Sequence, residues 1–269
     1  MGWPAAIALV LFILLARVTR EWLVLRTRAR QRGIFRRWPI PMVPIEALDP
    51  RFAPDDLGPT LDVEVHFIGR GSVAVPGGTS DTEASILAAM AIGAMRMFEF
   101  GTCTGKTTYL WAHNQPPGGR VATLTLAPNQ VGEYRAEVGD EEFALQHARL
   151  ESAFTKFRYT GTGVESHVEQ LYGDSKRFDE SPYLDSCDVV FVDGSHAYSY
   201  VVSDSAKALR MVKPGGVVLW HDYNSATTGV FKALNELAKQ LPLMHLRGTD
   251  LVAYRRPETG GLTPSLLRA

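Results

Sequence analysis

The sequence predicts an α/β fold in which helices cover a mostly parallel β-sheet, preceded by a separate apolar helix. From about residue 84 onward, short apolar segments alternate with helical segments of roughly 10–15 residues, a pattern typical of parallel strands joined by right-handed crossovers. Residues 187–192 (CDVVFV) are almost entirely apolar, as expected for a strand covered on both faces. Residues 3–16 form an uninterrupted apolar run near the start of the chain.

The composition is that of a globular protein. The chain has 269 residues, of which 45% are hydrophobic and 21% charged, enough for one large domain or two small ones. These values exclude a disordered chain, a collagen-like repeat and a disulfide-stapled secreted module. Cys103 and Cys187 are too few for a disulfide framework and lack the spacing of a zinc site, so they fit a reducing compartment.

The N-terminal apolar run predicts a membrane anchor. Residues 3–16 would cover about 21 Å as a helix, less than the ~30 Å hydrocarbon core. The helical pattern can continue to Trp22, which extends the span to about 28 Å. We therefore expect residues 1–26 to form a single-pass transmembrane helix in which Arg17 and Arg20 snorkel to one interface.

This segment has three alternative interpretations. A cleaved signal peptide carries positive charge before its apolar run, whereas here the charge follows it, and Ala-Arg-Val-Thr-Arg is a poor cleavage site. A helix lying in the membrane interface is less suited, because the run is apolar all round. A helix in a soluble core is the remaining alternative.

Charge is distributed unevenly along the chain. Residues 1–40 carry a net charge of +7, which leaves −8 for the rest of a chain whose total is −1. Because aromatic side chains are not interleaved with these arginines, we expect membrane lipids and no nucleic acid as the partner. The positive-inside rule then places the body on the cytoplasmic side of the inner membrane. The basic residues are Arg17, Arg20, Arg26, Arg28, Arg30, Arg32, Arg36 and Arg37.

The remaining chain divides into three parts. Residues 27–76 form a basic and Pro-rich linker, in which residues 38–60 hold six prolines and predict little regular structure. Residues 77–256 form the α/β domain, and residues 257–269 form a tail. The domain's expected helices are 84–94, 106–113, 141–157, 198–212 and 230–241. Its seven expected strands are 96–100, 120–126, 167–172, 187–192, 217–220, 243–246 and 251–254.

A glycine-rich turn follows the first strand of the domain. It reads Gly101-Thr-Cys-Thr-Gly105-Lys106-Thr107, with only three residues between the glycines. A phosphate-binding P-loop needs four, so an NTPase is excluded. The turn, with the acidic Glu99 before it, suits a small ligand that carries an amine and a nucleoside. A plain tight turn is the alternative.

Acidic residues and histidines follow two later strands. Asp193 and Asp222 come directly after neighbouring strands and could share a hard cation such as Mg²⁺. His196 and His221 are candidate general bases at neutral pH, the alternative being structural histidines that cap a turn or a helix. Two Asp–His pairs at adjacent strand ends favour a functional site.

The motifs together resemble a known family. The stretch from about residue 77 to 254, two thirds of the chain, resembles the class I S-adenosylmethionine-dependent methyltransferases, in particular a bacterial subfamily with DGSHxY and KPGGxxxxHDY motifs. The matching pieces are MFEFGTCTGKTTYLWA, YGDS, DVVFVDGSHAYSYVVSDSAKALRMVKPGGVVLWHDY and RGTDLVAY. The resemblance implies a Rossmann-like, doubly wound, seven-stranded sheet and S-adenosylmethionine as cofactor.

The resemblance also implies roles for individual residues. The methionine end of the cofactor would lie against the first loop, and the adenine against the Gly-Asp-Ser turn. Asp193 would lie beneath the sulfonium and could hold a metal together with Asp222, and His196 would occupy the position of a catalytic base. The residues implied to contact the cofactor are Glu99, Gly101, Thr102, Gly105, Thr125, Asp174, Ser175 and Asp193.

One position departs from the family pattern. Thr125 stands where this class usually has an acid that binds both ribose hydroxyls, and the loss corresponds to about 1–3 kcal/mol of binding. Two functions therefore stay open. The first is a membrane-anchored methyltransferase acting on an oxygen of a small or lipid-linked acceptor. The second is a catalytically weak or inactive methyltransferase-like subunit of a membrane protein complex.

Overall fold

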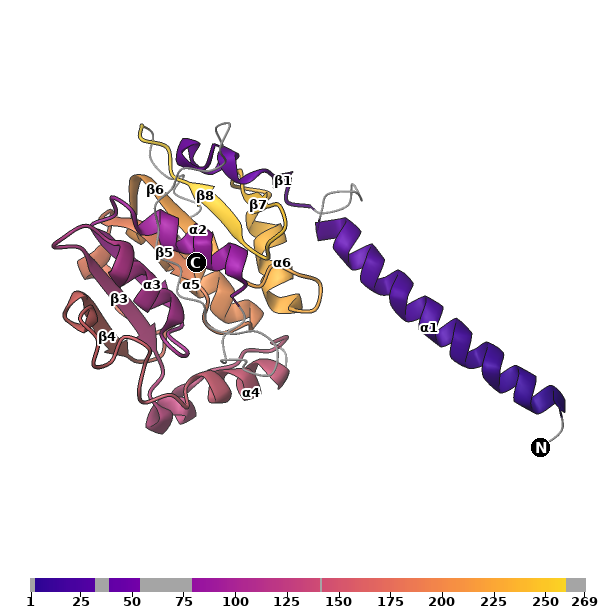
Figure 1. The fold of residues 1–269 in the computed structure, drawn as a ribbon. Helices are drawn as coiled ribbons and strands as arrows, with labels where there is room; N and C mark the ends of the chain where they lie inside the picture. The colour runs from indigo at the N-terminus through magenta and orange to yellow at the C-terminus, as the bar shows by residue number, and fades with distance from the viewer. Residues whose placement is uncertain (1–2, 32–38, 54–78, 141, 260–269) are drawn as a thin grey trace.

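An eight-stranded sheet forms the centre of the molecule (Figure 1). The structure is a computed structural model, and it describes residues 3–31, 39–53, 79–140 and 142–259. The strand order is β1-β7-β8-β6-β5-β2-β3-β4. Strand β8 pairs antiparallel with both β6 and β7, and all other neighbours are parallel. The strands are β1 (Met42–Val43), β2 (Arg96–Phe100), β3 (Arg120–Thr125), β4 (Val168–Tyr172), β5 (Cys187–Val192), β6 (Val212–Trp220), β7 (Met244–Leu246) and β8 (Val252–Arg255).

Helices cover both faces of this sheet. Apolar residues of α2 and α3 pack on one face against Met97, Val189 and Phe191. Residues of α5 and α6 pack on the other face against Phe98 and Val190, the alternate positions of the same strands. The helices are α1 (Trp3–Gln31), α2 (Asp81–Ala91), α3 (Lys106–Asn114), α4 (Glu142–Glu151), α5 (Tyr198–Met211) and α6 (Thr228–Leu237). Short 3₁₀ turns are η1 (Ile45–Ala47), η2 (Pro50–Phe52), η3 (Pro128–Glu133), η4 (Glu165–His167) and η5 (Ser181–Tyr183).

The predicted α/β architecture is confirmed, with one strand more than expected. Strands β2 and β5 have the predicted bounds. The eighth strand, β1, comes from the segment predicted to be an extended linker, where Met42 pairs with His245 at the sheet edge. Strand β6 begins at Val212 rather than at residue 217, because the Lys-Pro-Gly-Gly segment continues into the sheet through a register shift against β5.

Helix α4 ends earlier than the sequence suggests. It stops at Glu151 instead of residue 157. The chain then turns back, and the backbone N–H of Arg158 donates to the carbonyl of Thr104 at 2.8 Å. This long-range bond fastens the segment to the loop after β2, a tertiary contact that the helical pattern of the local sequence does not reveal.

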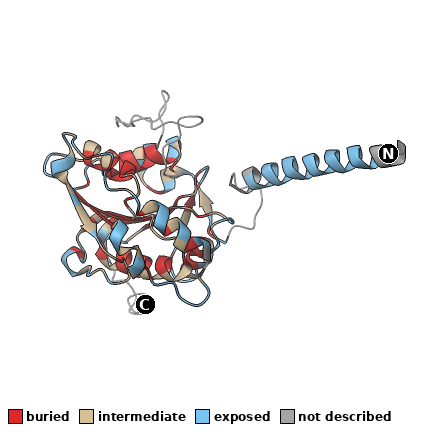
Figure 2. Cartoon of the chain, turned by 90° about the horizontal axis from the view of Figure 1, so that it is seen from below, coloured by how far each residue is buried: buried red, intermediate tan, exposed pale blue. Residues whose placement is uncertain are grey.

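Helix α1 stands away from the body, and its described side chains, residues 7–27, are all exposed (Figure 2). Among the described residues, none of the helices combines the length and the apolar content that crossing a bilayer requires. The transmembrane helix expected for residues 1–26 is therefore not supported. Arg32, Arg36 and Arg37, most of the linker and residues 260–269 of the tail lie outside the described residues.

Candidate functional site

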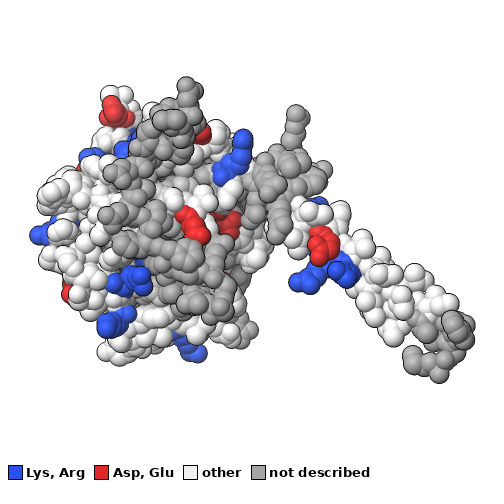
Figure 3. All heavy atoms as spheres, viewed as in Figure 1, with Lys and Arg blue, Asp and Glu red and all other residues white. Residues whose placement is uncertain are grey.

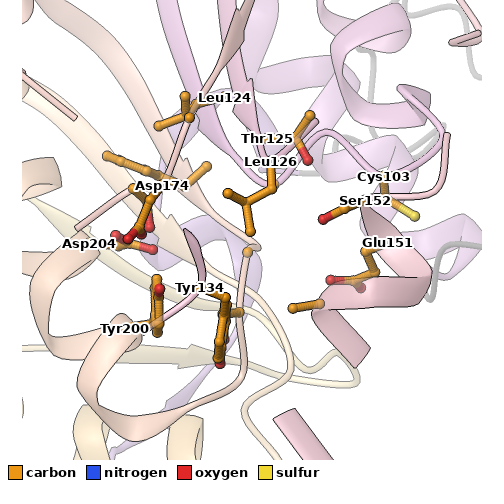
Figure 4. A pocket seen from close by; sticks show the side chains of 17 residues that line it. Cys103, Leu124, Thr125, Leu126, Tyr134, Glu151, Ser152, Asp174, Tyr200 and Asp204 are labelled. Carbon is orange, nitrogen blue, oxygen red and sulfur yellow. The ribbon is translucent and has the colours of Figure 1, made fainter. Parts of the chain in front are cut away.

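A cavity opens where β2, β3, β4 and β5 end (Figure 4). The carboxyl edge of a doubly wound sheet is where such folds bind ligands. We call this the main cavity. Among the residues that line it are four that the sequence predicts for cofactor binding: Gly101, Thr125, Asp174 and Ser175.

One wall of the main cavity holds two buried carboxyl groups, Asp174 and Asp204, on the same side in Figure 4. Oδ1 of Asp174 accepts the backbone N–H of Lys176 at 3.1 Å, whereas Oδ2 is buried and has no hydrogen-bond partner within the described part of the chain. Burial raises the pKa of Asp204 to about 7. A buried acceptor without a donor is costly, so Asp174 is suited to bind the N–H group of a ligand.

Aromatic rings line the same cavity. The rings of Tyr134 and Tyr200 stack with centroids 4.5 Å apart and an interplanar angle of 13°. The hydroxyl of Tyr134 lies 2.8 Å from Oγ of Ser195, and both residues line the cavity. The pair gives the cavity a rigid aromatic wall beside its polar groups.

Gly101 holds the loop after β2 against the end of β5. Its φ is +98°, and an added Cβ would lie 2.0 Å from the carbonyl oxygen of Asp193. The backbone N–H of Asp193 donates to the carbonyl of Phe100 at 2.9 Å. Glycine is required here because two backbones meet with no room for a side chain.

Glu99 lies beneath this loop and lines neither described cavity of the site. Its carboxyl accepts the hydroxyl of Thr123 at 2.6 Å and that of Thr108, and burial raises its pKa to about 8. Thr102 bonds to Thr123, and Gly105 begins α3 in the left-handed conformation. Glu99, Thr102 and Gly105 thus hold the loop after β2 in place. Their predicted contacts with the methionine end of the cofactor stay predictions.

A smaller cavity next to the main one contains the four residues predicted as catalytic or metal-binding. His196, His221, Asp193 and Asp222 all line it. Nε2 of His196 lies 2.8 Å from Oδ2 of Asp222, and Nδ1 of His221 lies 3.2 Å from both Oδ1 of Asp193 and Oδ2 of Asp222. The structure therefore brings together the two Asp–His pairs that the sequence placed at adjacent strand ends.

His221 carries positive charge between these carboxylates. Burial alone would lower the pKa of His221, but Asp193, Asp222 and Glu83 hold it well above its ordinary value. Glu83 lies 3.5 Å from Nε2 of His221, and its own pKa falls to about 2 because the interaction with His221 outweighs burial. An imidazolium thus occupies the position between the carboxylates that a shared cation would need. Binding of Mg²⁺ by Asp193 and Asp222 stays a prediction.

Sequence reasoning missed several residues of this region. Glu83 comes from α2, where it forms a capping box with Ser80, a pattern visible as Ser-x-x-Glu. His147 and Glu151 come from α4, and their spacing of four residues would have placed them on one helix face. No local sequence pattern predicts that α2 and α4 lie near the strand ends, because the packing of these helices depends on contacts between residues far apart in the chain.

Part of the chain matches the model of a known family. Residues 98–223, somewhat less than half of the chain, match the family model described as a methyltransferase domain. An uncharacterized protein of Acanthamoeba polyphaga mimivirus is 28% identical over 104 residues. That match covers 36% of this chain and 45% of the viral protein, so the chain spans less than half of the viral protein's length.

The chain is also similar to solved structures. The O-methyltransferase TomG from Streptomyces achromogenes, in complex with SAM, is 21% identical, with 66% of this chain and 81% of TomG covered and a TM-score of 0.43. An O-methyltransferase from Bacillus cereus in complex with SAH is 18% identical, covering 66% and 82%, with a TM-score of 0.42. The SAH-bound methyltransferase PaMTH1 of Podospora anserina is 15% identical, covering 66% and 79%, with a TM-score of 0.47. The family match supports a methyltransferase domain over residues 98–223, which lie within the domain that the sequence predicts for residues 77–256.

Proposed function

We propose that this chain is a class I S-adenosylmethionine-dependent methyltransferase that acts on an oxygen atom of its acceptor. The observation that carries the proposal is the main cavity, which lies at the carboxyl edge of the sheet inside the matched domain and presents an unpartnered, buried carboxylate oxygen. When bound, the cofactor would supply the electrophilic methyl group.

The residues of the main cavity fit a nucleoside cofactor. Oδ2 of Asp174 would accept an N–H of the adenine amine, which satisfies one of the two carboxylate oxygens that line this cavity buried and without a hydrogen-bond partner among the described residues, the other being Oδ1 of Asp204. Thr125 at the end of β3 would meet the ribose with a neutral hydroxyl in place of the usual acid. The stacked pair of Tyr134 and Tyr200 would border the same ligand.

The smaller cavity supplies groups for the acceptor. Methyl transfer requires positioning of the acceptor oxygen and removal of its proton. His196 is better suited than His221 as the base, because both nitrogens of His221 lie within 3.5 Å of carboxylate oxygens, whereas among the described residues His196 approaches a carboxylate through Nε2 alone, which leaves Nδ1 for the acceptor. Asp222 would orient His196 and stabilise the imidazolium that forms. A small or lipid-linked hydroxyl compound is the proposed acceptor.

The test is calorimetric titration with S-adenosylmethionine and S-adenosylhomocysteine. We expect binding by the wild type and an affinity at least about 10-fold lower in Asp174→Asn, which presents an amide to the adenine amine. Asp81→Asn, an exposed acid on α2, is the matched control and should bind as the wild type does. No heat with either ligand at millimolar concentration contradicts the proposal.

We also propose that α1 holds the chain on the cytoplasmic face of an anionic membrane. Large apolar side chains of α1 are exposed, with Phe12 at 68% and Leu15 at 65%. In Figure 3 the charged side chains drawn on α1 lie toward the body, and its described part carries Arg17, Arg20, Glu21 and Arg26, all C-terminal to the apolar run. An exposed apolar helix with adjacent arginines suits attachment to anionic lipid.

Vesicle sedimentation tests this attachment. The full chain should pellet with vesicles that contain anionic lipid and much less with purely zwitterionic ones. Phe12→Asp combined with Leu15→Asp should abolish pelleting. Val138→Asp, which replaces a fully exposed apolar residue of the body, should have no effect. Equal pelleting of all variants contradicts the proposal.

Thr125 favours a second candidate function, that of a weakly active or inactive subunit of a membrane protein complex. The neutral hydroxyl at the ribose position would weaken cofactor binding. Purification in mild detergent tests this candidate: a defined partner should accompany the chain. Release of the chain alone and monomeric contradicts it.

A further inference from the structure

Three metal-ligating side chains from two separate segments meet between the two cavities. His147 and Glu151 lie on α4, and His196 follows β5. One ligand atom from each of the three lies within 4.8 Å of the others. The rings of His147 and His196 are 4.6 Å apart between centroids, and Nδ1 of His147 lies 3.4 Å from Oε1 of Glu151.

Packing of α4 determines this arrangement. His147 and Glu151 are four residues apart and therefore share one face of the helix. Ala144 and Ala148, also four apart, pack in one buried cluster with Ala197, the residue that follows His196. These small side chains allow α4 to pack closely against the loop after β5. The packing fixes the distance between the ligand atoms on α4 and the ligand atom of His196.

His196 has the environment of a metal ligand. Its side chain is nine-tenths buried, with 10% of its surface exposed. Nε2 faces Asp222 at 2.8 Å, whereas Nδ1 is buried and has no hydrogen-bond partner in the described ranges. Metal-binding histidines commonly donate one ring N–H to a carboxylate and ligate through the other nitrogen. Asp222 supplies that carboxylate here.

We propose that His147, Glu151 and His196 bind a divalent transition-metal ion of the Zn²⁺ type, at a site separate from the Asp193–Asp222 pair. Because Nδ1 of His196 would ligate the ion, it can act as the proposed base only while the metal is absent. Two imidazoles and one carboxylate are a donor set that suits zinc and its neighbours rather than Mg²⁺ or Ca²⁺, which prefer oxygen ligands. Glu151 lines the main cavity and His196 the smaller one. Three protein ligands leave a coordination position open toward a small molecule bound between them.

The test is titration of the untagged full chain with ZnCl₂, followed by calorimetry, and with CoCl₂, followed by visible absorption. We expect one ion per chain and Co²⁺ bands that show nitrogen ligation. Affinity should fall by about 100-fold or more in His147→Ala and in Glu151→Gln, since even outer-shell partners are worth roughly 10–100-fold. Mg²⁺ should not compete.

Two variants separate this site from other sources of binding. Gln146→Ala, an exposed neighbour on α4, should bind zinc as the wild type does. Asp193→Asn should keep the zinc site as well. Absence of zinc binding up to millimolar concentration overturns the proposal, as does unchanged affinity in His147→Ala. Loss of binding in Asp193→Asn with retention in His147→Ala places the ion at the other cluster and also overturns it.

Discussion

Nε2 of His196 lies 2.8 Å from Oδ2 of Asp222, and this pair joins the ends of two neighbouring strands. Asp222 adopts a φ of +60°, a conformation that a non-glycine residue enters at a cost. The strained backbone directs one carboxylate toward both His196 and His221. Both the proposed base and the proposed metal ligand depend on this carboxylate.

Asp222→Asn should slow methyl transfer by about 10²–10⁴-fold, the usual contribution of an oriented general base. Asparagine keeps the shape but removes the charge that stabilises protonated His196. The rate is measured under saturating cofactor for Asp222→Asn, for His196→Gln and for the double variant. If the two residues act as one unit, the double variant should lose little more than either single one. If the rate of the double variant falls by the product of the two single losses, Asp222 and His196 act independently and the proposed unit is contradicted.

Gly101→Ala should lower the free energy of unfolding by about 3 kcal/mol or more, because the new Cβ would lie 2.0 Å from the carbonyl oxygen of Asp193 and φ is +98°. Urea denaturation measures the change. Gly132→Ala is the matched control, since its added Cβ meets nothing within 4 Å, and it should stay within about 0.5 kcal/mol of the wild type. Equal stability of the two variants would contradict the packing described for Gly101.

Glu99 should make stability fall as pH rises. Its pKa is about 8 in the folded chain and has its ordinary value of 4.5 when unfolded. Between these pH values the folded state binds more protons, so ionisation favours unfolding and stability decreases from pH 5 to 8. Glu99→Gln should reduce this decrease, measured by urea denaturation at several pH values. Glu258→Gln, an exposed control, should retain it. An unaltered pH dependence in Glu99→Gln would be inconsistent with a protonated Glu99.

Thr125→Asp should tighten binding of S-adenosylmethionine by up to about 100-fold, because a carboxylate can accept both ribose hydroxyls where the threonine hydroxyl cannot. Calorimetry on the wild type and the variant measures the difference. Thr125→Val serves as the second comparison and should bind no better than the wild type. A weaker Thr125→Asp complex would mean that the ribose does not lie against the end of β3.

Much of the fold could be predicted because buried positions are occupied by apolar residues, which follow one another or recur along the chain in the pattern of a strand or a helix. Strand β5 (CDVVFV) is almost entirely apolar, and strand β2 (RMFEF) is buried from Met97 to Phe100 although it contains Glu99; the sequence predicts the bounds of both. The meeting of Asp193 with Asp222 could be predicted too, since consecutive parallel strands end at the same edge of the sheet.

The tertiary structure alone decided the rest. Two-residue strand β1 has no periodicity and exists only because Met42 and Val43 pair with β7. The approach of Glu83 to His221 and of His147 to His196 depends on how α2 and α4 pack, across separations of more than 40 residues. The sequence determined which side chains end each strand and which helical residues share a face. Long-range packing determined which of them meet, because the contacts between separate elements leave no local pattern in the chain.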